Sequence, residues 1–554
     1  MSKTPTPSPV DCDALVIGAG FAGLYAIHKL RESNFSVTAI ESGGDVGGTW
    51  YWNRYPGARC DVESISYSYT FDPELVENWR WSERFASQPE ILEYARWVAD
   101  ELDLRRSITF NTRVDKAEYD ETSSTWLVHT SDGLQTRARF LISAVGCLSA
   151  ESIPQFPGLQ TYSGEVYHTG RWPHHDVNLT GKRVAVIGTG SSGIQAIPEI
   201  AKQAAHLTVF QRTPNYSLPA RNRPLYADEH ADAVKNLGKR RDRARSCPTG
   251  IGIGFGLNEA LSLNDMDRRD TFDRYWHTGG NLFVTAFSDL ATNLTANHEA
   301  AEYVREKIAT IVDDPKTAQI LTPVDYPIGA KRICVDTDYY STFNSPHVDL
   351  VDLREDPLET ITDVGIKTEH NEFDFDVIVF ATGYDGMTGP LTRMDLRGRG
   401  GLALADKWSN GPTNYLGVAL AEFPNMFTIT GPGSPSVLAN VIASIEQHVE
   451  WIVECMVYMR RNSFHEIETS ARSEQSWVEH VNAIAERTLY VHAKSWYLGD
   501  NIEGKTRVFM PYAGGLNNYR EKCAEIATAN YEGFSFAGDK KSARSTTATT
   551  LASS

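Results

Sequence analysis

The sequence predicts an α/β protein with two parallel, doubly wound sheets, and two observations lead to this prediction. The pattern Gly-x-Gly-x-x-Gly occurs twice, at residues 14–23 (ALVIGAGFAG) and at residues 184–193 (VAVIGTGSSG). Each copy follows a short aliphatic run typical of a buried strand and continues into a segment with helical periodicity. Together these features predict two Rossmann-like β-α-β units, and each unit is a candidate dinucleotide-binding domain.

The composition is that of a folded protein with several domains. The chain has 554 residues, of which 41% are hydrophobic and 22% are charged, as in ordinary globular proteins. Its net charge of −18 produces a field that repels nucleic acid and anionic membrane surfaces. No apolar run is long enough for a membrane span, and the first residues carry no secretory signal. We therefore expect a cytoplasmic protein that binds neither nucleic acid nor membranes.

The first glycine motif is expected to bind a dinucleotide that lacks a 2′-phosphate. Gly18 allows a tight turn, Gly20 lets the backbone approach a pyrophosphate, and Gly23 lets the helix pack on the strand. A second strand is predicted at residues 36–41, and it ends in Glu41. An acidic side chain at this position binds a free ribose hydroxyl.

The second glycine motif is expected to prefer NADP. Gly188, Gly190 and Gly193 repeat the three glycine positions, and the next predicted strand, residues 207–212, ends in Arg212. A cation at this place suits a 2′-phosphate, whereas NAD would need an acid. An arginine that is simply exposed to solvent is the alternative interpretation.

A chain with both sites is a two-dinucleotide flavoprotein, in which the first site suits the adenosine half of FAD. Reductases and monooxygenases both fit this description. Disulfide reductases need a cysteine pair beside the flavin, and the seven cysteines contain no Cys-x-x-Cys spacing, so that class is excluded. The 15 histidines show no metal-ligand spacing, and we expect no metal because flavin itself activates O2.

The rest of the chain has weaker patterns. Residues 220–325 are charged and helical in character, and an apolar strand with a turn is predicted within residues 374–385. The two ends, residues 1–11 and 541–554, have too few apolar side chains to pack and are predicted to be mobile.

Two longer motifs resemble the signatures of the type I Baeyer–Villiger monooxygenases. Before the second glycine motif the chain carries Tyr162-x-Gly164-x-x-x-His168-x-x-x-Trp172-Pro173, which resembles the family pattern Phe-x-Gly-x-x-x-His-x-x-x-Trp-Pro with Tyr162 in place of Phe. The second family pattern is matched by Gly47-Gly48-Thr49-Trp50, Tyr55-Pro56-Gly57 and Asp61. Further similarity covers roughly residues 12–535 and includes KRICVDTDYY (331–340), ATGYD (381–385), GPGSPS (431–436) and SWYLGDNIEGK (495–505).

The resemblance is strongest to the phenylacetone, steroid and cyclohexanone monooxygenases. It implies tightly bound FAD, NADPH as reductant, O2 as co-substrate, and conversion of a ketone to an ester or lactone through a flavin C4a-peroxide. It also implies a domain layout: an FAD-binding domain at 12–147 and 385–540, an NADP-binding domain at 148–219 and 326–384, and a helical insertion at 220–325.

The resemblance assigns catalytic roles to Arg332 and Asp61. Arg332 matches the family arginine that stabilises the peroxyanion and the adduct, and a guanidinium keeps its charge at working pH. Asp61 matches the carboxylate that orients it and offsets its desolvation. His168 and Trp172 are expected to couple the domains, although a purely structural histidine fits His168 equally well.

The motifs and the resemblance together predict the cofactor-binding residues. Cys60 is given no redox role, because a solitary thiol beside a flavin is more often a packing residue. The predicted cofactor-binding residues are Gly18, Gly20, Phe21, Gly23, Glu41, Gly48, Thr49, Trp50, Tyr51, Trp52, Arg59, Cys60, Asp61, Tyr67, Val114, Gly188, Thr189, Gly190, Ser191, Ser192, Gly193, Arg212, Thr213, Lys331, Val441 and Trp496.

The sequence thus predicts an FAD-containing, NADPH-dependent Baeyer–Villiger monooxygenase that acts on a small-molecule ketone, whether aryl, cyclic, steroidal or long-chain, as a monomer or weak oligomer. One alternative is a flavin monooxygenase that oxygenates nitrogen or sulfur, against which Arg332 and the Trp172-Pro173 pair argue. Another is a non-catalytic dinucleotide-binding redox module, which would have lost the catalytic residues.

Overall fold

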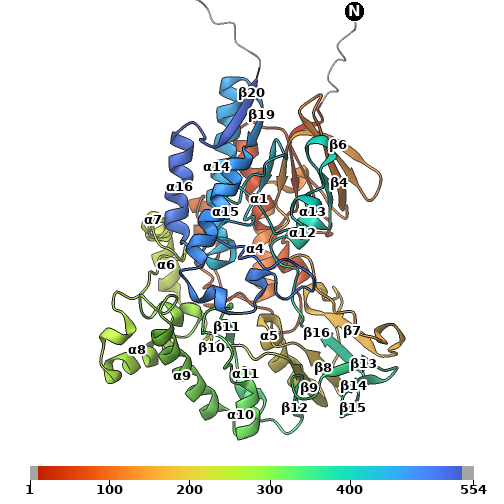
Figure 1. The fold of residues 1–554 in the computed structure, drawn as a ribbon, viewed down its shortest axis with the longest axis vertical. Helices are drawn as coiled ribbons and strands as arrows, with labels where there is room; N and C mark the ends of the chain where they lie inside the picture. Colours follow the sequence, from red (N-terminus) through yellow and green to blue (C-terminus); the bar gives the residue numbers. More distant parts are fainter. Residues whose placement is uncertain (1–9, 539–554) are drawn as a thin grey trace, which may run out of the picture.

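The two glycine motifs lie at strand ends in two separate sheets. The computed structural model describes residues 10–538, and Figure 1 shows the first sheet at the upper right and the second at the lower right. The segments predicted to be mobile, 1–11 and 541–554, lie outside the described residues except for Val10 and Asp11. The prediction is wrong for Asp11, because its N–H donates to the carbonyl of Arg137 at 2.8 Å.

The first sheet has eight strands within residues 10–538, in the order β17-β4-β5-β6-β1-β2-β3, with β18 also paired to β6. β1 lies between β6 and β2 and is parallel to both, which is why its side chains are buried on both faces. β4, β5 and β6 form an antiparallel meander. The strands are β1 (Cys12–Ile17), β2 (Val37–Ile40), β3 (Ile108–Thr109), β4 (Val114–Asp120), β5 (Thr125–Thr130), β6 (Gln135–Ser143), β17 (Asp395–Arg397) and β18 (Met426–Thr428).

The second sheet is entirely parallel, in the order β12-β9-β8-β16-β7. Helix α1 (Phe21–Glu32) follows β1, and helix α5 (Ser191–Ala201) follows β8 in the same way. Both β-α-β units are therefore as predicted. The strands of this sheet are β7 (Glu165–His168), β8 (Arg183–Ile187), β9 (His206–Gln211), β12 (Val348–Asp352) and β16 (Val377–Phe380). A small antiparallel sheet beside it contains β13 (Leu358–Ile361), β14 (Gly365–Thr368) and β15 (Glu372–Asp374).

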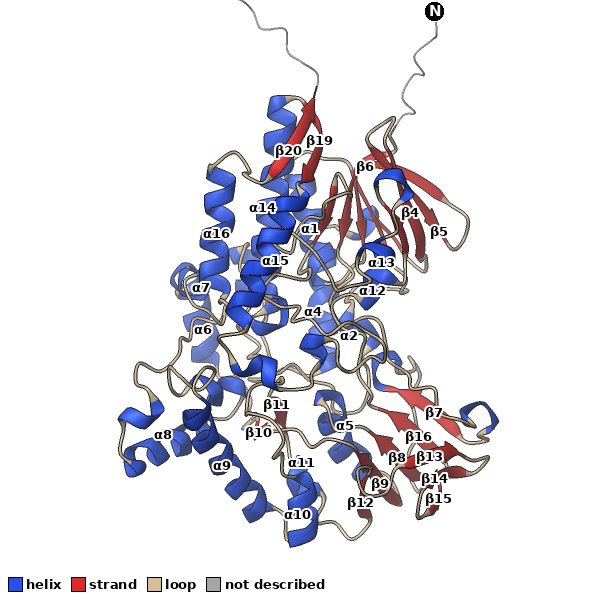
Figure 2. Cartoon of the chain, viewed as in Figure 1, coloured by secondary structure: helices blue, strands red, loops and turns tan. Residues whose placement is uncertain are grey.

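Helices dominate the segment between β9 and β12, at the lower left of Figure 2. A short parallel pair, β10 (Ser217–Pro219) and β11 (Cys334–Asp336), closes this segment onto the second sheet's domain. Aromatic side chains of Phe272, Phe283 and Tyr303 pack together in its core. The helices are α6 (Ala227–Lys235), α7 (Leu237–Arg245), α8 (Asp265–Thr278), α9 (Leu294–Ile311), α10 (Pro315–Leu321) and α11 (Tyr339–Thr342).

The C-terminal part of the chain returns to the first sheet. Strands β17 and β18 join that sheet, and the long helix α14 (Val441–Asn462) packs on α1. The predicted boundaries of the FAD and NADP domains stay a prediction. The remaining elements are α2 (Thr49–Trp52), α3 (Pro73–Asn78), α4 (Gln88–Glu101), α12 (Gly389–Thr392), α13 (Leu404–Lys407), β19 (Phe464–Thr469), α15 (Ala471–Ala485), α16 (Leu516–Thr528) and β20 (Phe534–Gly538).

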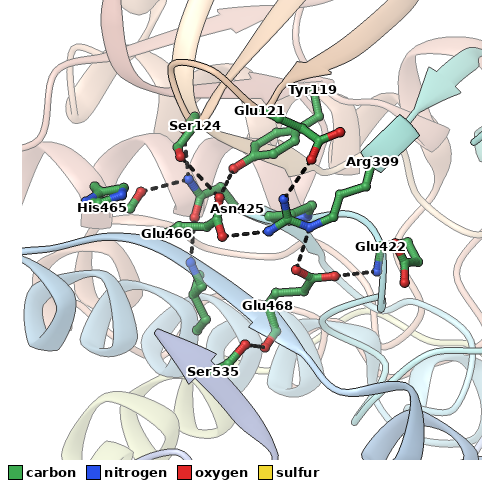
Figure 3. A network of polar contacts seen from close by, with 12 residues as sticks. Tyr119, Glu121, Ser124, Arg399, Glu422, Asn425, His465, Glu466, Glu468 and Ser535 are labelled. Carbon is green, nitrogen blue, oxygen red and sulfur yellow. Dashed lines mark hydrogen bonds and ion pairs between the residues drawn. The ribbon is translucent and has the colours of Figure 1, made fainter. Parts of the chain in front are cut away.

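A polar network ties the two-stranded antiparallel sheet β19–β20 to the meander of the first sheet, as Figure 3 shows. The guanidinium of Arg399 contacts Glu466 at 2.6 Å, Glu468 at 2.8 Å and Glu121 at 3.2 Å. Tyr119 of β4 donates its hydroxyl hydrogen to Glu466. The carboxylates of Glu468 and Glu466 raise the pKa of Arg399 against the opposing effect of burial, so the guanidinium stays charged. The two-stranded sheet β19–β20 is thereby fixed beside the first sheet.

Within residues 10–538, no helix combines the length and the hydropathy that a membrane span requires.

Candidate active site

The first glycine loop has no room for larger side chains at its outer positions. Gly18 has φ of +101°, and a Cβ there would lie 2.8 Å from the carbonyl oxygen of Ala144 in the loop after β6. A Cβ at Gly23 would collide with the carbonyl oxygen of Gly18. Gly20 is the N-cap of α1, so the first N–H groups of the helix face the loop as an anion site requires.

Glu41 lies buried directly beside this loop. Its carboxylate accepts hydrogen bonds from the N–H of Ala19 and the N–H of Gly43, both at 2.7 Å. The acid predicted from the end of the second strand is therefore held at the turn between β1 and α1, where the prediction places the ribose. Thr112 N–H donates to the Glu41 carbonyl at 3.0 Å and brings the start of β4, Val114, to the same edge.

Aromatic side chains form the next part of the site. Gly48 approaches the first loop so closely that a Cβ there would lie 2.8 Å from Cα of Gly20. Trp50 Nε1 donates to the Tyr67 hydroxyl at 3.1 Å, and the Tyr67 ring meets Phe21 edge-on at 5.7 Å. Burial raises the pKa of Tyr67, so its hydroxyl stays protonated. The other predicted residues of helix α2 are Thr49, which is exposed, and Tyr51 and Trp52, whose rings pack edge-on at 4.9 Å.

Arg332 and Asp61 form a bidentate ion pair, although they are 271 positions apart in the chain. Arg332 Nε donates to one carboxylate oxygen at 2.8 Å and Nη2 donates to the other at 2.7 Å. Nη1 donates to the carbonyl of Val437 at 2.6 Å. Burial alone would lower the pKa of Arg332, but the charge and hydrogen bonds of Asp61 raise it above its ordinary value. The guanidinium is a permanent, oriented cation.

Arg59 and Cys60 precede Asp61 but make different contacts. Arg59 is ion-paired with Glu83 and donates to the carbonyl of Phe85, so its charge is already matched within the protein. Cys60 is buried, and burial raises the pKa of its thiol. A thiol that keeps its proton is a poor nucleophile, which agrees with a packing role.

The second glycine loop repeats the geometry of the first. Gly188 has φ of +110° and lies against the carbonyl of Ala381, while a Cβ at Gly193 would collide with the carbonyl of Gly188. At Gly190, by contrast, a Cβ would meet no atom within 4 Å. The space over Gly190 is open at the N-terminus of α5, where a pyrophosphate would need it. Thr189 is buried and donates to the carbonyl of Thr213 at 3.2 Å, and Ser191 and Ser192 are the first residues of α5.

Arg212 and Lys331 form a pair of cations beside the second loop. Burial lowers the pKa of Lys331, and the positive charge of Arg212 lowers it further, so the two side chains are close enough to repel each other. Lys331 Nζ lies 4.2 Å from the centre of the Tyr326 ring. Among residues 10–538 neither cation has a carboxylate within 4.0 Å. Two neighbouring, unmatched cations are the donor set that a phosphate dianion requires.

His168 and Trp172 lie in the domain of the second sheet, at and just after the end of β7. His168 is buried at the end of β7, its Nδ1 accepts from the N–H of Gly170 at 3.0 Å, and its Nε2 lies 3.3 Å from Oγ1 of Thr382. Burial lowers the pKa of His168, so it is neutral near pH 7. Trp172 is buried against Tyr167, with ring centres 5.1 Å apart. These contacts lie within the second domain, so the expected role of both residues in coupling the domains stays a prediction.

Val441 and Trp496 come from the C-terminal part of the chain. Val441 is the first residue of α14, four positions after the Val437 carbonyl that Arg332 binds. Trp496 lies on Gly386, where a Cβ would be 2.8 Å from the indole. Trp496 therefore packs on the turn after β16, and Val441 follows the segment whose carbonyl binds Arg332.

Three contacts of this region were not predicted from the sequence. The Val437 carbonyl accepts a hydrogen bond from Arg332. Burial raises the pKa of the Tyr497 hydroxyl, and the nearby charge of Arg332 lowers it in part. Gln195 of α5 accepts a hydrogen bond from the Tyr55 hydroxyl at 2.8 Å. Val437 directly follows the GPGSPS segment and Tyr497 directly follows Trp496, so their positions next to family motifs could have indicated them. Gln195 carries no such signal.

Comparison with known proteins agrees with this geometry. A model of the flavin-binding monooxygenase-like family matches residues 13–223. The chain is 42% identical to a cyclohexanone 1,2-monooxygenase of an Acinetobacter species, covering 95% of this chain and 96% of the relative. It is 43% identical to the phenazine N-monooxygenase PhzNO1 of Lysobacter antibioticus (96% and 98% covered), and 42% identical to a Baeyer–Villiger monooxygenase of Pseudooceanicola batsensis (94% and 95% covered).

Solved structures give the same result. An oxidized steroid monooxygenase bound to NADP superposes with a TM-score of 0.91 at 48% identity, covering 95% of this chain and 99% of that one. The complex of OTEMO with FAD and NADP superposes with a TM-score of 0.93 at 39% identity, covering 96% and 100%. The chain therefore belongs to the Baeyer–Villiger monooxygenase family, and it is an FAD-containing, NADPH-dependent monooxygenase.

Proposed function

We propose that this enzyme uses NADPH and O2 to convert a ketone to an ester or lactone, with Arg332 as its central catalytic group. The observation that carries the proposal is the bidentate pair of Arg332 and Asp61, at the meeting point of the residues predicted for both cofactors. Because the chain is an FAD-containing, NADPH-dependent monooxygenase, the alternative of a non-catalytic redox module is excluded.

The residues around the first loop fit FAD. The N-terminus of α1 would hold the pyrophosphate and Glu41 would bind the ribose. Trp50, Tyr67 and Phe21, which contact one another, would line the site. Bound FAD supplies the activation of O2 and the transfer of one oxygen atom. The protein contributes the orientation of the flavin and the exclusion of water around it.

The residues around the second loop fit NADPH. Open space over Gly190 leaves room for the pyrophosphate, and the unmatched cations Arg212 and Lys331 would bind the 2′-phosphate. Arg212 can bind it with two parallel N–H groups and Lys331 as a point charge. Trp496, from the C-terminal part, would cover the cofactor ribose.

Arg332 would bind the oxygen on which negative charge develops. A guanidinium has five N–H groups, and the bonds to Asp61 and Val437 use three of them. The others can donate to the substrate. Because Asp61 fixes the plane of the guanidinium, little reorganisation is needed when charge appears, and such preorganised charge is worth most where water is excluded.

A panel of cyclic, aryl and steroidal ketones tests the proposal. Purified enzyme with NADPH and O2 should give a product 16 mass units heavier than at least one ketone, as an ester or lactone by mass spectrometry. The reaction should consume about one NADPH per product, the stoichiometry of a monooxygenase. Oxidation of NADPH with every ketone recovered unchanged would contradict the proposal.

Oxygenation of an aromatic nitrogen is a second candidate, favoured by the 43% identity to a phenazine N-monooxygenase. Phenazine in the same assay distinguishes the two, because its product would be an N-oxide and not an ester. Turnover of phenazine with no ketone turnover would replace the first proposal by the second.

The proposal includes a cytoplasmic enzyme that works as a monomer or weak oligomer and needs no added metal. Size-exclusion chromatography across a range of concentrations tests the oligomeric state. Activity after dialysis against a chelator tests the metal, since flavin chemistry should survive it.

A further inference from the structure

The turn after β16 connects the second domain with the first domain and with the C-terminal part of the chain. It spans residues 381–387 and carries the ATGYD segment. Its first residue lies against the second glycine loop, because a Cβ at Gly188 would be 2.5 Å from the carbonyl oxygen of Ala381. Three residues later, the hydroxyl of Tyr384 reaches helix α2. The turn therefore contacts a loop predicted to bind NADP and a helix predicted to bind FAD.

The contact with helix α2 is a buried hydrogen bond. The Tyr384 hydroxyl donates to Oδ1 of Asn53 at 2.5 Å. Asn53 is buried and is the C-cap residue of α2, and its side chain makes no other hydrogen bond within residues 10–538. Burial raises the pKa of Tyr384, so the hydroxyl keeps the proton that it donates. One hydrogen bond thus joins the turn to the end of α2.

Helix α2 extends from this bond to the first glycine loop. Its N-cap residue is Gly48, where a Cβ would lie 2.8 Å from Cα of Gly20. Between Gly48 and Asn53 the helix carries Trp50, which is predicted to contact FAD. A helix of four residues is only about one turn long and moves as one body. The position of Asn53 therefore also determines the position of Trp50.

The ring of Tyr384 rests on the motif segment that leads to the second sheet. A Cβ at Gly170 would lie 2.7 Å from this ring, and the His168 ring meets it edge-on with ring centres 6.4 Å apart. Thr169, between them, is buried, and its Oγ1 lies 3.1 Å from Oγ of Ser192. Ser192 belongs to the first turn of α5, where the pyrophosphate of NADP is expected. The motif segment thus contacts both the Tyr384 ring and the predicted NADP site.

The C-terminal part of the chain holds the backbone of the same turn. Asn501 Nδ2 donates to the carbonyl of Tyr384 at 2.7 Å. Lys505 forms a partly buried ion pair with Asp385, the next residue of the turn. Neither contact involves the hydroxyl of Tyr384. Replacing Tyr384 by Phe therefore keeps the turn and the ring in place and removes only the bond to α2.

We propose that Tyr384 is a positioning residue for flavin reduction, and that its hydrogen bond with Asn53 carries the effect of NADP binding from the second domain to helix α2. A nucleotide at the second loop would fix the motif segment through Ser192 and Thr169, and the Tyr384 ring resting on that segment would hold α2 beside the flavin. The inference concerns the two cofactors and holds whichever substrate is oxygenated, so it does not rest on the proposed ketone oxidation.

Amide hydrogen exchange tests the inference without turnover. In the FAD-loaded wild-type enzyme, saturating NADP+ should slow exchange in peptides that cover residues 47–53 by about fivefold, the effect of one neutral hydrogen bond. In Tyr384→Phe the same peptides should be slowed by less than about twofold, because the bond to Asn53 is missing. Peptides that cover residues 188–193 should be protected equally in both proteins, since NADP+ still binds.

Anaerobic rapid mixing with NADPH gives a second readout. The limiting rate of flavin reduction should fall about five- to tenfold in Tyr384→Phe, because hydride transfer depends steeply on the alignment of the reacting groups. The Kd for NADPH should stay within about twofold of the wild type, because the contacts of the second loop are unchanged. A merely structural defect would instead lower the melting temperature, the FAD content and the affinity for NADPH together.

Asn53→Ala and the double variant show whether the two side chains act through their mutual bond. If they do, the double variant should reduce its flavin no more slowly than either single variant. Tyr167→Phe is the matched control, because Tyr167 also donates its hydroxyl to a side chain, but its acceptor Glu165 lies in the same strand β7. This control should match the wild type in both assays.

Three results would overturn the inference. The first is that NADP+ leaves exchange in residues 47–53 unchanged in the wild type, and the second is that it protects them undiminished in Tyr384→Phe. The third is that the effects of Tyr384→Phe and Asn53→Ala on the reduction rate are additive, since independent sites add. Each result is obtained with FAD and nucleotide alone, so failure to convert a ketone leaves the test intact.

Discussion

At the scale of single residues, the local charge around a site decides which ligands it can bind. The overall charge of −18 argues against polyanionic partners, yet the protein must hold two anionic dinucleotides. We propose that local cations without an ion-pair partner allow this. Arg212 and Lys331 lack carboxylate partners within the described part of the chain, whereas Arg59, which was also predicted to be near the cofactor, is matched by Glu83.

Arg212→Ala and Lys331→Ala should each raise the KM for NADPH by roughly ten- to hundredfold, the value of a hydrogen bond between charged groups. The KM for NADH should change less than about twofold, because NADH has no 2′-phosphate. Steady-state kinetics with both nucleotides measures the ratio. Parallel changes for NADPH and NADH would remove these residues from the phosphate site.

Sequence reasoning predicted these side chains because their chemistry is visible in their type and position. It could not predict the Val437 carbonyl, since every residue has one and only the fold decides which faces Arg332. The pairing of Arg332 with Asp61 was likewise implied by the resemblance and not by the residues, because nothing local links positions so far apart.

At the scale of elements, the two glycine loops allow a test that separates packing from binding. Gly193→Ala places a Cβ against the carbonyl of Gly188, whereas Gly190→Ala places one in open space. We expect Gly193→Ala to destabilise the protein by about 1–3 kcal/mol through overpacking. Gly190→Ala should keep the wild-type melting temperature and FAD content but bind NADP more weakly.

Differential scanning calorimetry and NADP titration of both variants measure these effects. Loss of stability in Gly190→Ala to the same extent as in Gly193→Ala would show that the space over Gly190 is needed for folding and not for a ligand.

Helix α14 contains a buried histidine with a predictable pH effect. His448 Nδ1 accepts from the N–H of Thr430 at 2.9 Å, and burial lowers the pKa of His448 to about 3. In the unfolded chain its pKa is about 6.5. The contribution to stability is therefore complete above pH 6.5 and is lost progressively as the pH falls toward 3, at up to about 1.4 kcal/mol per pH unit.

His448→Asn should consequently be less stable than the wild type at pH 7.5, and the difference should shrink between pH 6.5 and pH 5. Melting temperatures of the two proteins across this range measure it. A difference that is independent of pH would mean that His448 is not neutral in the folded protein.

The long motifs predicted elements well, with strand ends within one residue: residues 36–41 against β2 (Val37–Ile40) and residues 207–212 against β9 (His206–Gln211). Short strands escaped prediction. β17 and β18 have three residues each, too few for any periodicity. They are strands only because β4 has a free edge and because residues 141–143 of β6 extend beyond its pairing with β5.

At the scale of the whole molecule, contacts between the two sheet-bearing domains hold the segment that leads to Asp61. Gln195 of α5 accepts from the Tyr55 hydroxyl and donates to the Arg59 carbonyl at 3.1 Å, so the helix that begins at the second loop holds the segment leading to Asp61. Residue patterns predicted both domains, but the return of the chain to the first sheet was implied by the resemblance alone.

Gln195→Leu should leave FAD content and the rate of NADPH oxidation within about twofold of the wild type. It should lower the yield of oxygenated product per NADPH, because Asp61 and hence Arg332 would be held less firmly and bound oxygen would be released as H2O2. Product and H2O2 assays on the same sample measure this coupling. An unchanged yield would show that the contact is not needed for alignment.

Arg332 unites the three parts of the molecule, since it binds Asp61 of the first domain and the Val437 carbonyl of the C-terminal part. The most direct test compares Arg332→Ala, Arg332→Lys and the wild type, with a ketone that the wild type converts, and measures ester formed and NADPH consumed. We predict that Arg332→Ala retains FAD and part of its NADPH oxidation but makes no ester, and that Arg332→Lys restores little, because lysine cannot form the bidentate pair. Ester formation by Arg332→Ala at a rate near that of the wild type would contradict the account.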